Sequence, residues 1–92
     1  MPQAPALRYI SNQGDEALVR FDGFTGRVLI DRKLAIVTSP KVEQQALRQS
    51  AALRQNGLEG MWEVPSEIQA ARARALLDKP GIDNITIRVV PF

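Results

Sequence analysis

Two stretches of the sequence repeat one helical pattern at a spacing of 24 residues. Residues 43–57 and 67–81 share the pattern E-x-Q-A-x-R-x-x-A-x-L-x-x-x-G. An apolar run typical of a β-strand precedes each stretch, and another follows it. Residues 34–90 are therefore predicted to fold as β-α-β-α-β, with parallel strands joined by right-handed crossovers. The match indicates either a duplicated unit or two alanine-rich amphipathic helices of similar composition.

The two helices carry clear start and stop signals. Thr38-Ser39-Pro40 supplies a hydroxyl N-cap followed by proline, and predicts a helix that runs through Gln55. The second helix is predicted to begin at Pro65-Ser66, because Ser66 and Gln69 have the spacing of a capping box. It is predicted to end near Asp78, before a Lys-Pro-Gly sequence.

The first half of the chain has the two-residue alternation of β-strands. Ala17–Phe21 alternates between two faces, and Arg27–Asp31 is a second strand candidate. Asp22–Gly26 lies between them and contains two glycines, which predicts a turn and hence a β-hairpin. Leu34–Val37 is a further strand candidate that would lead into the first helix.

Residues 1–92 are thus predicted to form one α+β or α/β domain. We expect an N-terminal β-hairpin followed by β-α-β-α-β, with a mixed sheet and two short helices on one face. A separate hairpin packed beside a small α+β unit is the alternative. Within the domain we expect a flexible arm over 1–6, a β-rich region over 7–37 and a two-helix region over 38–92.

Cysteine and histidine are both absent from the chain. Disulfides, zinc sites built on thiolate or imidazole, a thiol nucleophile and a histidine base are therefore excluded. Ser39 and Ser66 are explained as helix caps, and no S-x-x-K spacing offers a serine a lysine base. We therefore expect no enzyme and predict no catalytic residue, no cofactor and no metal ligand.

The charge of the chain is almost balanced, with 12 basic and 10 acidic residues and a formal net charge of +2. Binding to nucleic acid is unfavoured, since such proteins concentrate positive charge on one face. No apolar run approaches the length of a membrane span, and no signal peptide is visible. We expect the cytoplasm, or the virion if a phage encodes the chain.

Association with a protein partner is the function that the sequence favours. Phe24 in the turn and Phe92 at the chain end are large apolar groups that a small domain can bury only with difficulty. The strand near the C-terminus is β-branched and is expected at a sheet edge, where free backbone groups invite another strand. We expect a homo- or hetero-oligomeric assembly. The candidate interface residues are Phe24, Arg27, Ile85, Ile87, Arg88, Val90 and Phe92.

One segment of the sequence resembles part of a known protein family. A β-turn-helix motif in small structural proteins of tailed bacteriophages is similar to three parts of this sequence: Trp62–Ile68, Ala70-Ala71 and Ala75–Gly81. The resemblance covers about residues 61–82, and the helix over 40–55 departs from it. It implies a virion role at the capsid or the head-tail region, and it carries over no functional residue. A small cytoplasmic regulator that binds a protein or a nucleic acid is the alternative function.

Overall fold

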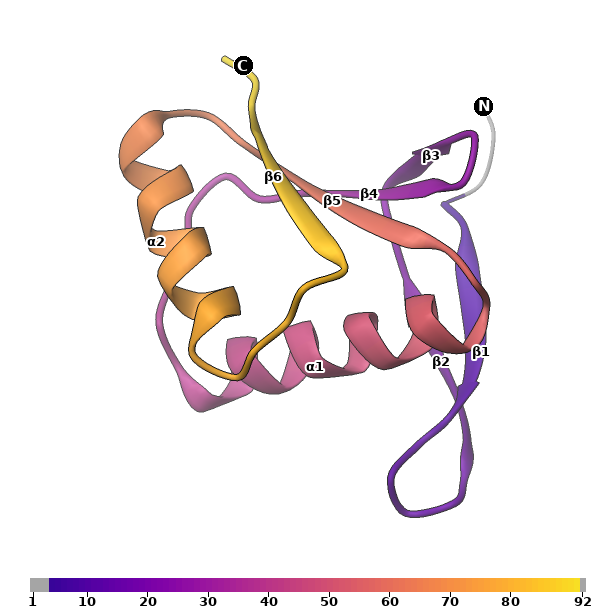
Figure 1. Ribbon diagram of the computed structural model, residues 1–92. Coiled ribbons are helices and arrows are strands. Elements are labelled where there is room, and N and C mark those ends of the chain that lie inside the picture. The colour runs from indigo at the N-terminus through magenta and orange to yellow at the C-terminus, as the bar shows by residue number, and fades with distance from the viewer. Residues whose placement is uncertain (1–3, 92) are drawn as a thin grey trace.

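The computed structural model describes residues 4–91, which form two β-sheets and two α-helices (Figure 1). Strands β1 (Ala6–Ile10) and β2 (Glu16–Arg20) pair antiparallel as a two-stranded sheet. The remaining elements follow in the order β3 (Gly23–Thr25), β4 (Val28–Arg32), α1 (Pro40–Gln55), β5 (Glu59–Val64), α2 (Glu67–Asp78) and β6 (Ile85–Val89).

The second sheet has four strands in the order β3-β4-β5-β6. Strand β3 is antiparallel to β4, whereas β4, β5 and β6 are parallel to one another. The two crossovers, β4-α1-β5 and β5-α2-β6, proceed in the same direction across the sheet, so right-handed connections place both helices on one face. Helices α1 and α2 indeed contact each other on that side (Figure 1). The predicted fold class is confirmed: a β-hairpin followed by a mixed sheet with two helices.

Both helix N-termini are capped as the sequence predicts. The Ser39 hydroxyl oxygen accepts a hydrogen bond from the Val42 N–H at 3.3 Å, and the Ser66 hydroxyl accepts one from the Gln69 N–H at 3.3 Å. Helix α1 has the predicted bounds, and it ends where Gly57 adopts a φ of 66° that favours glycine.

The strand pairing in the first half differs from the predicted hairpin. The segment 17–21 was expected to pair with 27–31, but β2 pairs with β1, and β4 pairs with the short strand β3. Strand β3 lies inside the segment expected to be a turn. Asp22 holds this segment against β4, because its N–H donates to the Ile30 carbonyl at 2.8 Å and its carboxylate accepts from the Arg32 N–H at 2.7 Å.

The strand predicted over 34–37 is also wrong, and β4 takes its place as the first strand of the β-α-β-α-β unit. Leu34 is 72% exposed and Val37 is 61% exposed, so only Ile36 of this apolar run enters the core. The Ile36 N–H donates to the side-chain oxygen of Gln69 at 2.8 Å rather than to a neighbouring strand. The run therefore serves as the connection between β4 and α1.

The flexible arm predicted over 1–6 falls partly outside the described residues, which begin at Ala4. The carbonyl of Pro5 accepts a hydrogen bond from the Phe21 N–H at 2.9 Å, and β1 starts at Ala6. The end of the predicted arm is therefore joined to the hairpin.

The core lies between the sheet and the two helices, and alanines on the helices allow a close approach. Gly60 of β5 lies directly beneath α1: an added Cβ there would meet Leu53 Cδ1 at 2.7 Å and Ile85 Cγ1 at 3.2 Å. The β1–β2 hairpin packs on the same helix and extends this core. The buried apolar residues are Tyr9, Val19, Phe21, Leu29, Ile36, Ala46, Ala52, Leu53, Trp62, Val64, Ala70, Ala73, Leu76, Leu77, Ile82 and Ile85.

Candidate functional site

Strand β6 forms one edge of the four-stranded sheet, and within residues 4–91 no strand pairs with its outer side. The Gly60 N–H donates to the Asn84 carbonyl at 2.9 Å, and the Val90 N–H donates to the Val64 carbonyl at 2.8 Å. Successive residues of a parallel strand direct their backbone groups to opposite sides. Positions 84, 86, 88 and 90 therefore bond to β5, and the N–H and C=O groups of positions 85, 87 and 89 point outward.

The side chains of β6 divide between the two faces of the sheet. Ile85 is buried at 7% exposure, and Ile87 and Val89 are half-buried against the same core. Arg88 and Thr86 are exposed on the opposite face. Among the predicted interface residues of this strand, Ile85 and Ile87 thus offer outward backbone groups, while Arg88 offers an exposed side chain.

Val90 follows β6 and is half-buried, and its N–H is already used in the bond to Val64. Phe92 lies outside the described residues. Of the predicted C-terminal contact, the structure therefore describes β6 and Val90 but not Phe92.

Phe24 and Arg27 lie at the other end of the sheet. Phe24 belongs to β3, the opposite edge strand, and is 61% exposed. The guanidinium of Arg27 donates to the carbonyl of Gly57, at the turn between α1 and β5. Because β4 and β5 separate β3 from β6, the structure does not bring the predicted interface residues together on one surface.

A buried polar cluster joins β4, β5 and α1. The indole N–H of Trp62, which is fully buried, donates to Gln49 Oε1 at 2.7 Å, and Gln49 Nε2 donates to Asp31 Oδ2 at 2.7 Å. Lys33 Nζ lies 3.0 Å from Asp31 Oδ2 and 4.9 Å from the centroid of the Trp62 ring. It also donates to Gln45 Oε1 at 2.9 Å.

Burial raises the pKa of Asp31 above its ordinary value of 3.8, against the opposing effects of the hydrogen bond from Gln49 and the charge of Lys33. The interface hypothesis did not include this cluster. The alternation of β4 could have revealed it, because Asp31 falls on the same face as the core residue Leu29. Every buried side-chain nitrogen and oxygen of the described residues has a hydrogen-bond partner.

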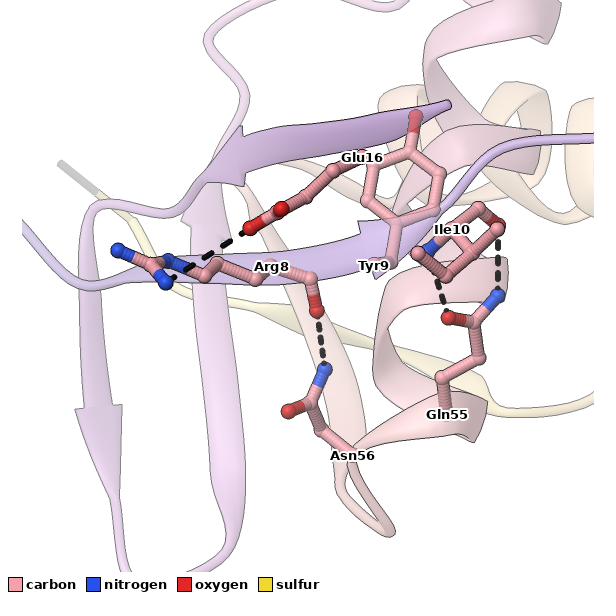
Figure 2. Close-up of a pocket in the computed structure, with 6 residues that line it drawn as sticks. All are labelled: Arg8, Tyr9, Ile10, Glu16, Gln55 and Asn56. Carbon is pink, nitrogen blue, oxygen red and sulfur yellow. Dashed lines mark hydrogen bonds and ion pairs between the residues drawn. The ribbon is translucent and has the colours of Figure 1, made fainter. Parts of the chain in front are cut away.

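A small pocket of about 180 Å³ lies between the β1–β2 hairpin and the end of α1, and its lining residues are drawn in Figure 2. Gln55 bonds to both backbone groups of Ile10, accepting from its N–H at 2.7 Å and donating to its carbonyl at 2.8 Å (Figure 2). Asn56 Nδ2 donates to the Arg8 carbonyl at 2.9 Å. These side chains cover the outer edge of β1, so the pocket walls fasten the hairpin to the helix.

Among the described residues, no group of three acidic, histidine or cysteine side chains is arranged to hold a metal ion. No helix in that part of the chain has the length and apolar character needed to span a membrane. Comparison of the chain with protein-family models, with curated proteins and with solved structures finds no match.

Proposed function

We propose that this chain is a non-enzymatic structural module that makes protein–protein contacts in a homo- or hetero-oligomeric assembly, with β6 as its contact strand. The observation that carries the proposal is the outer edge of β6, where three successive outward positions leave their N–H and C=O groups unpaired by any described strand. Such an edge accepts an added strand from another chain through main-chain hydrogen bonds.

The other sheet edges are less suited to strand addition. Strand β3 is only three residues long. The outer edge of β1 is covered by Gln55 and Asn56. Strand β2 exposes two charged side chains, Glu16 and Arg20, against the single Arg88 of β6, and charged side chains on an edge discourage pairing. Strand β6 has five residues, all of its outward positions are β-branched, and it contains neither a proline nor an acidic residue.

The polar cluster around Trp62 supports a structural role for the buried polar residues. Trp62, Gln49 and Asp31 satisfy one another across three elements, and Lys33 neutralises the buried carboxylate. A closed network of this kind specifies how α1 sits on the sheet. The virion setting, at the capsid or head-tail region, rests on the resemblance of residues 61–82 and stays a prediction.

Photo-crosslinking from the β6 edge tests the proposal. We would replace Arg88 with benzoylphenylalanine in the full chain and irradiate cells of the natural source, using the same replacement at the exposed Arg74 of α2 as the matched control. We expect a protein adduct, identified by mass spectrometry, from position 88 and none from position 74. Equal absence of adducts at both positions would contradict the use of β6 as a contact strand.

Binding of single-stranded oligonucleotides serves as a second readout on the same purified chain. We expect no binding at moderate ionic strength. Binding that weakens steeply with added salt would instead favour the regulator hypothesis, because neutralised phosphates release counterions.

A further inference from the structure

We propose that the strand added to β6 is β6 of a second copy of this chain, running antiparallel about a two-fold axis at Ile87. The inference rests on the proposed function and names the partner of the same edge. It rests on the fit between β6 and a copy of itself rotated by 180°. In that arrangement the outward backbone positions of the two strands pair, and their exposed side chains are compatible.

The backbone geometry selects one register. Antiparallel strands bond only where outward-facing positions lie opposite each other. With Ile87 opposite Ile87 of the second copy, Ile85 lies opposite Val89, and all three outward positions are paired in both copies. The next allowed register shifts the second strand by two residues, and in either direction it leaves one outward position of each strand without a partner.

The exposed side chains favour the same register. With Ile87 on the axis, Thr86 lies opposite Arg88 of the second copy on the open face of the sheet, and each pair occurs twice by symmetry. The shifted register that pairs Ile87 with Val89 would set Arg88 opposite Arg88, and like charges directly opposite each other destabilise a strand pair. The small net charge of +2 adds little repulsion between the copies.

The resulting dimer is closed. The two-fold axis of an antiparallel pair is perpendicular to the sheet, so the two four-stranded sheets join edge to edge with all helices on one side. Ile87, half-buried in one copy, gains Ile87 of the second copy as a neighbour on the helix side. Among the described residues, the joined sheet ends on each side at the three-residue strand β3, which is too short to continue the pairing into a fibre.

Charge substitutions at Thr86 test the register with opposite expected signs. Thr86→Arg sets arginine opposite arginine twice and should weaken the dimer about five-fold, whereas Thr86→Glu sets glutamate opposite arginine twice and should tighten it about five-fold. Thr86→Val keeps the shape, removes the 3.3 Å bond from the hydroxyl to the Gly60 carbonyl and should change the dissociation constant little. Gln44→Arg and Gln44→Glu, exposed on α1, are controls for net charge.

Sedimentation equilibrium of the full chain measures the dissociation constants, and circular dichroism at low concentration checks that each variant is folded. The proposal expects a dimer whose affinity changes in opposite directions for the two charged Thr86 variants and is unchanged by the Gln44 variants. A chain that stays monomeric up to about 1 mM, where specific association is already weak, would overturn it. So would a dimer indifferent to both charges at Thr86.

Failure of self-pairing is distinguishable from failure of the proposed function. A monomeric chain whose position 88 still crosslinks to a different protein would refute the second copy as partner and leave the contact role of β6 standing. A monomeric chain without any adduct would contradict both.

Discussion

Replacement of Gly60 by alanine should destabilise the fold, because α1 passes too close to β5 to admit a Cβ. The added atom would lie 2.7 Å from Leu53 Cδ1 and 3.2 Å from Ile85 Cγ1. Leu53 is fully buried and Ile85 nearly so, which leaves neither side chain free to move aside. Overpacking of a core costs about 1–3 kcal/mol, and reduced freedom of the unfolded chain returns about 0.4–1 kcal/mol.

We therefore expect Gly60→Ala to lower the free energy of unfolding by about 1–2 kcal/mol. For a domain of this size, each kcal/mol lowers Tm by about 4–8 °C. Urea unfolding followed by the fluorescence of the single tryptophan, Trp62, measures the change. The urea dependence of the free energy should stay constant if only the folded state is affected.

Gly23→Ala is the matched control. Gly23 also lies in a strand and has no positive φ, but an added Cβ there would have no neighbour within 4 Å. It should change stability by less than about 0.5 kcal/mol, as for ordinary surface substitutions. The reasoning would be refuted if Gly60→Ala were as stable as Gly23→Ala, since the close approach of α1 to β5 would then be wrong.

Three further predictions concern the polar contacts. Trp62→Phe leaves the buried Gln49 oxygen without its donor and should cost about 1–3 kcal/mol by circular dichroism melts; a neutral result would contradict the cluster. The raised pKa of Asp31 means that the folded state binds its proton more tightly than the unfolded state, so wild-type stability relative to Asp31→Asn should fall as pH rises from about 3.8 through the folded pKa. Urea unfolding across that pH range checks the sign, and a relative stability that rises with pH would refute it. Gln55→Ala removes both bonds to Ile10 and should speed amide exchange in β1, with a loss of about 1 kcal/mol.

Much of the second half could be predicted from the sequence because its signals are local. The hydroxyl groups of Ser39 and Ser66 cap the helix N-termini, and the positive φ of Gly57 ends α1. Each of these signals depends only on residues close in the sequence. The β-branched strand expected near the C-terminus is β6, and it lies at an edge of the sheet, as expected.

The first half was harder because strand pairing there depends on distant residues. The chain offers two consecutive apolar runs before α1, over 27–31 and 34–37, and only the first pairs with β5. Nothing local distinguishes them: the choice depends on the parallel register of β4 with a strand that follows α1. The residues that flank Phe24 are similarly typical of a turn, yet backbone hydrogen bonds to β4 make this segment a strand.

The candidate interface could be predicted as a strand but not as a set of side chains. The sequence predicts an edge strand whose free backbone groups invite another strand, but it does not predict which face each side chain takes. The structure directs the side chains of Ile85 and Ile87 to the core and their backbone groups to the outside. The helix packed against a strand, here α2, decides which of its alternating side chains face the core, and the strand sequence alone does not.

Amide hydrogen exchange at β6, measured by NMR on dilute and concentrated samples, reports directly whether β6 pairs with a second copy of the chain. The N–H groups of Ile85, Ile87 and Val89 should exchange fast in the dilute chain and become protected together as concentration rises. The N–H groups of Gly60 and Val90, which bond within the sheet, should be protected in both samples. Exchange at the three outward positions that is equally fast at every concentration would contradict pairing of β6 with a second copy.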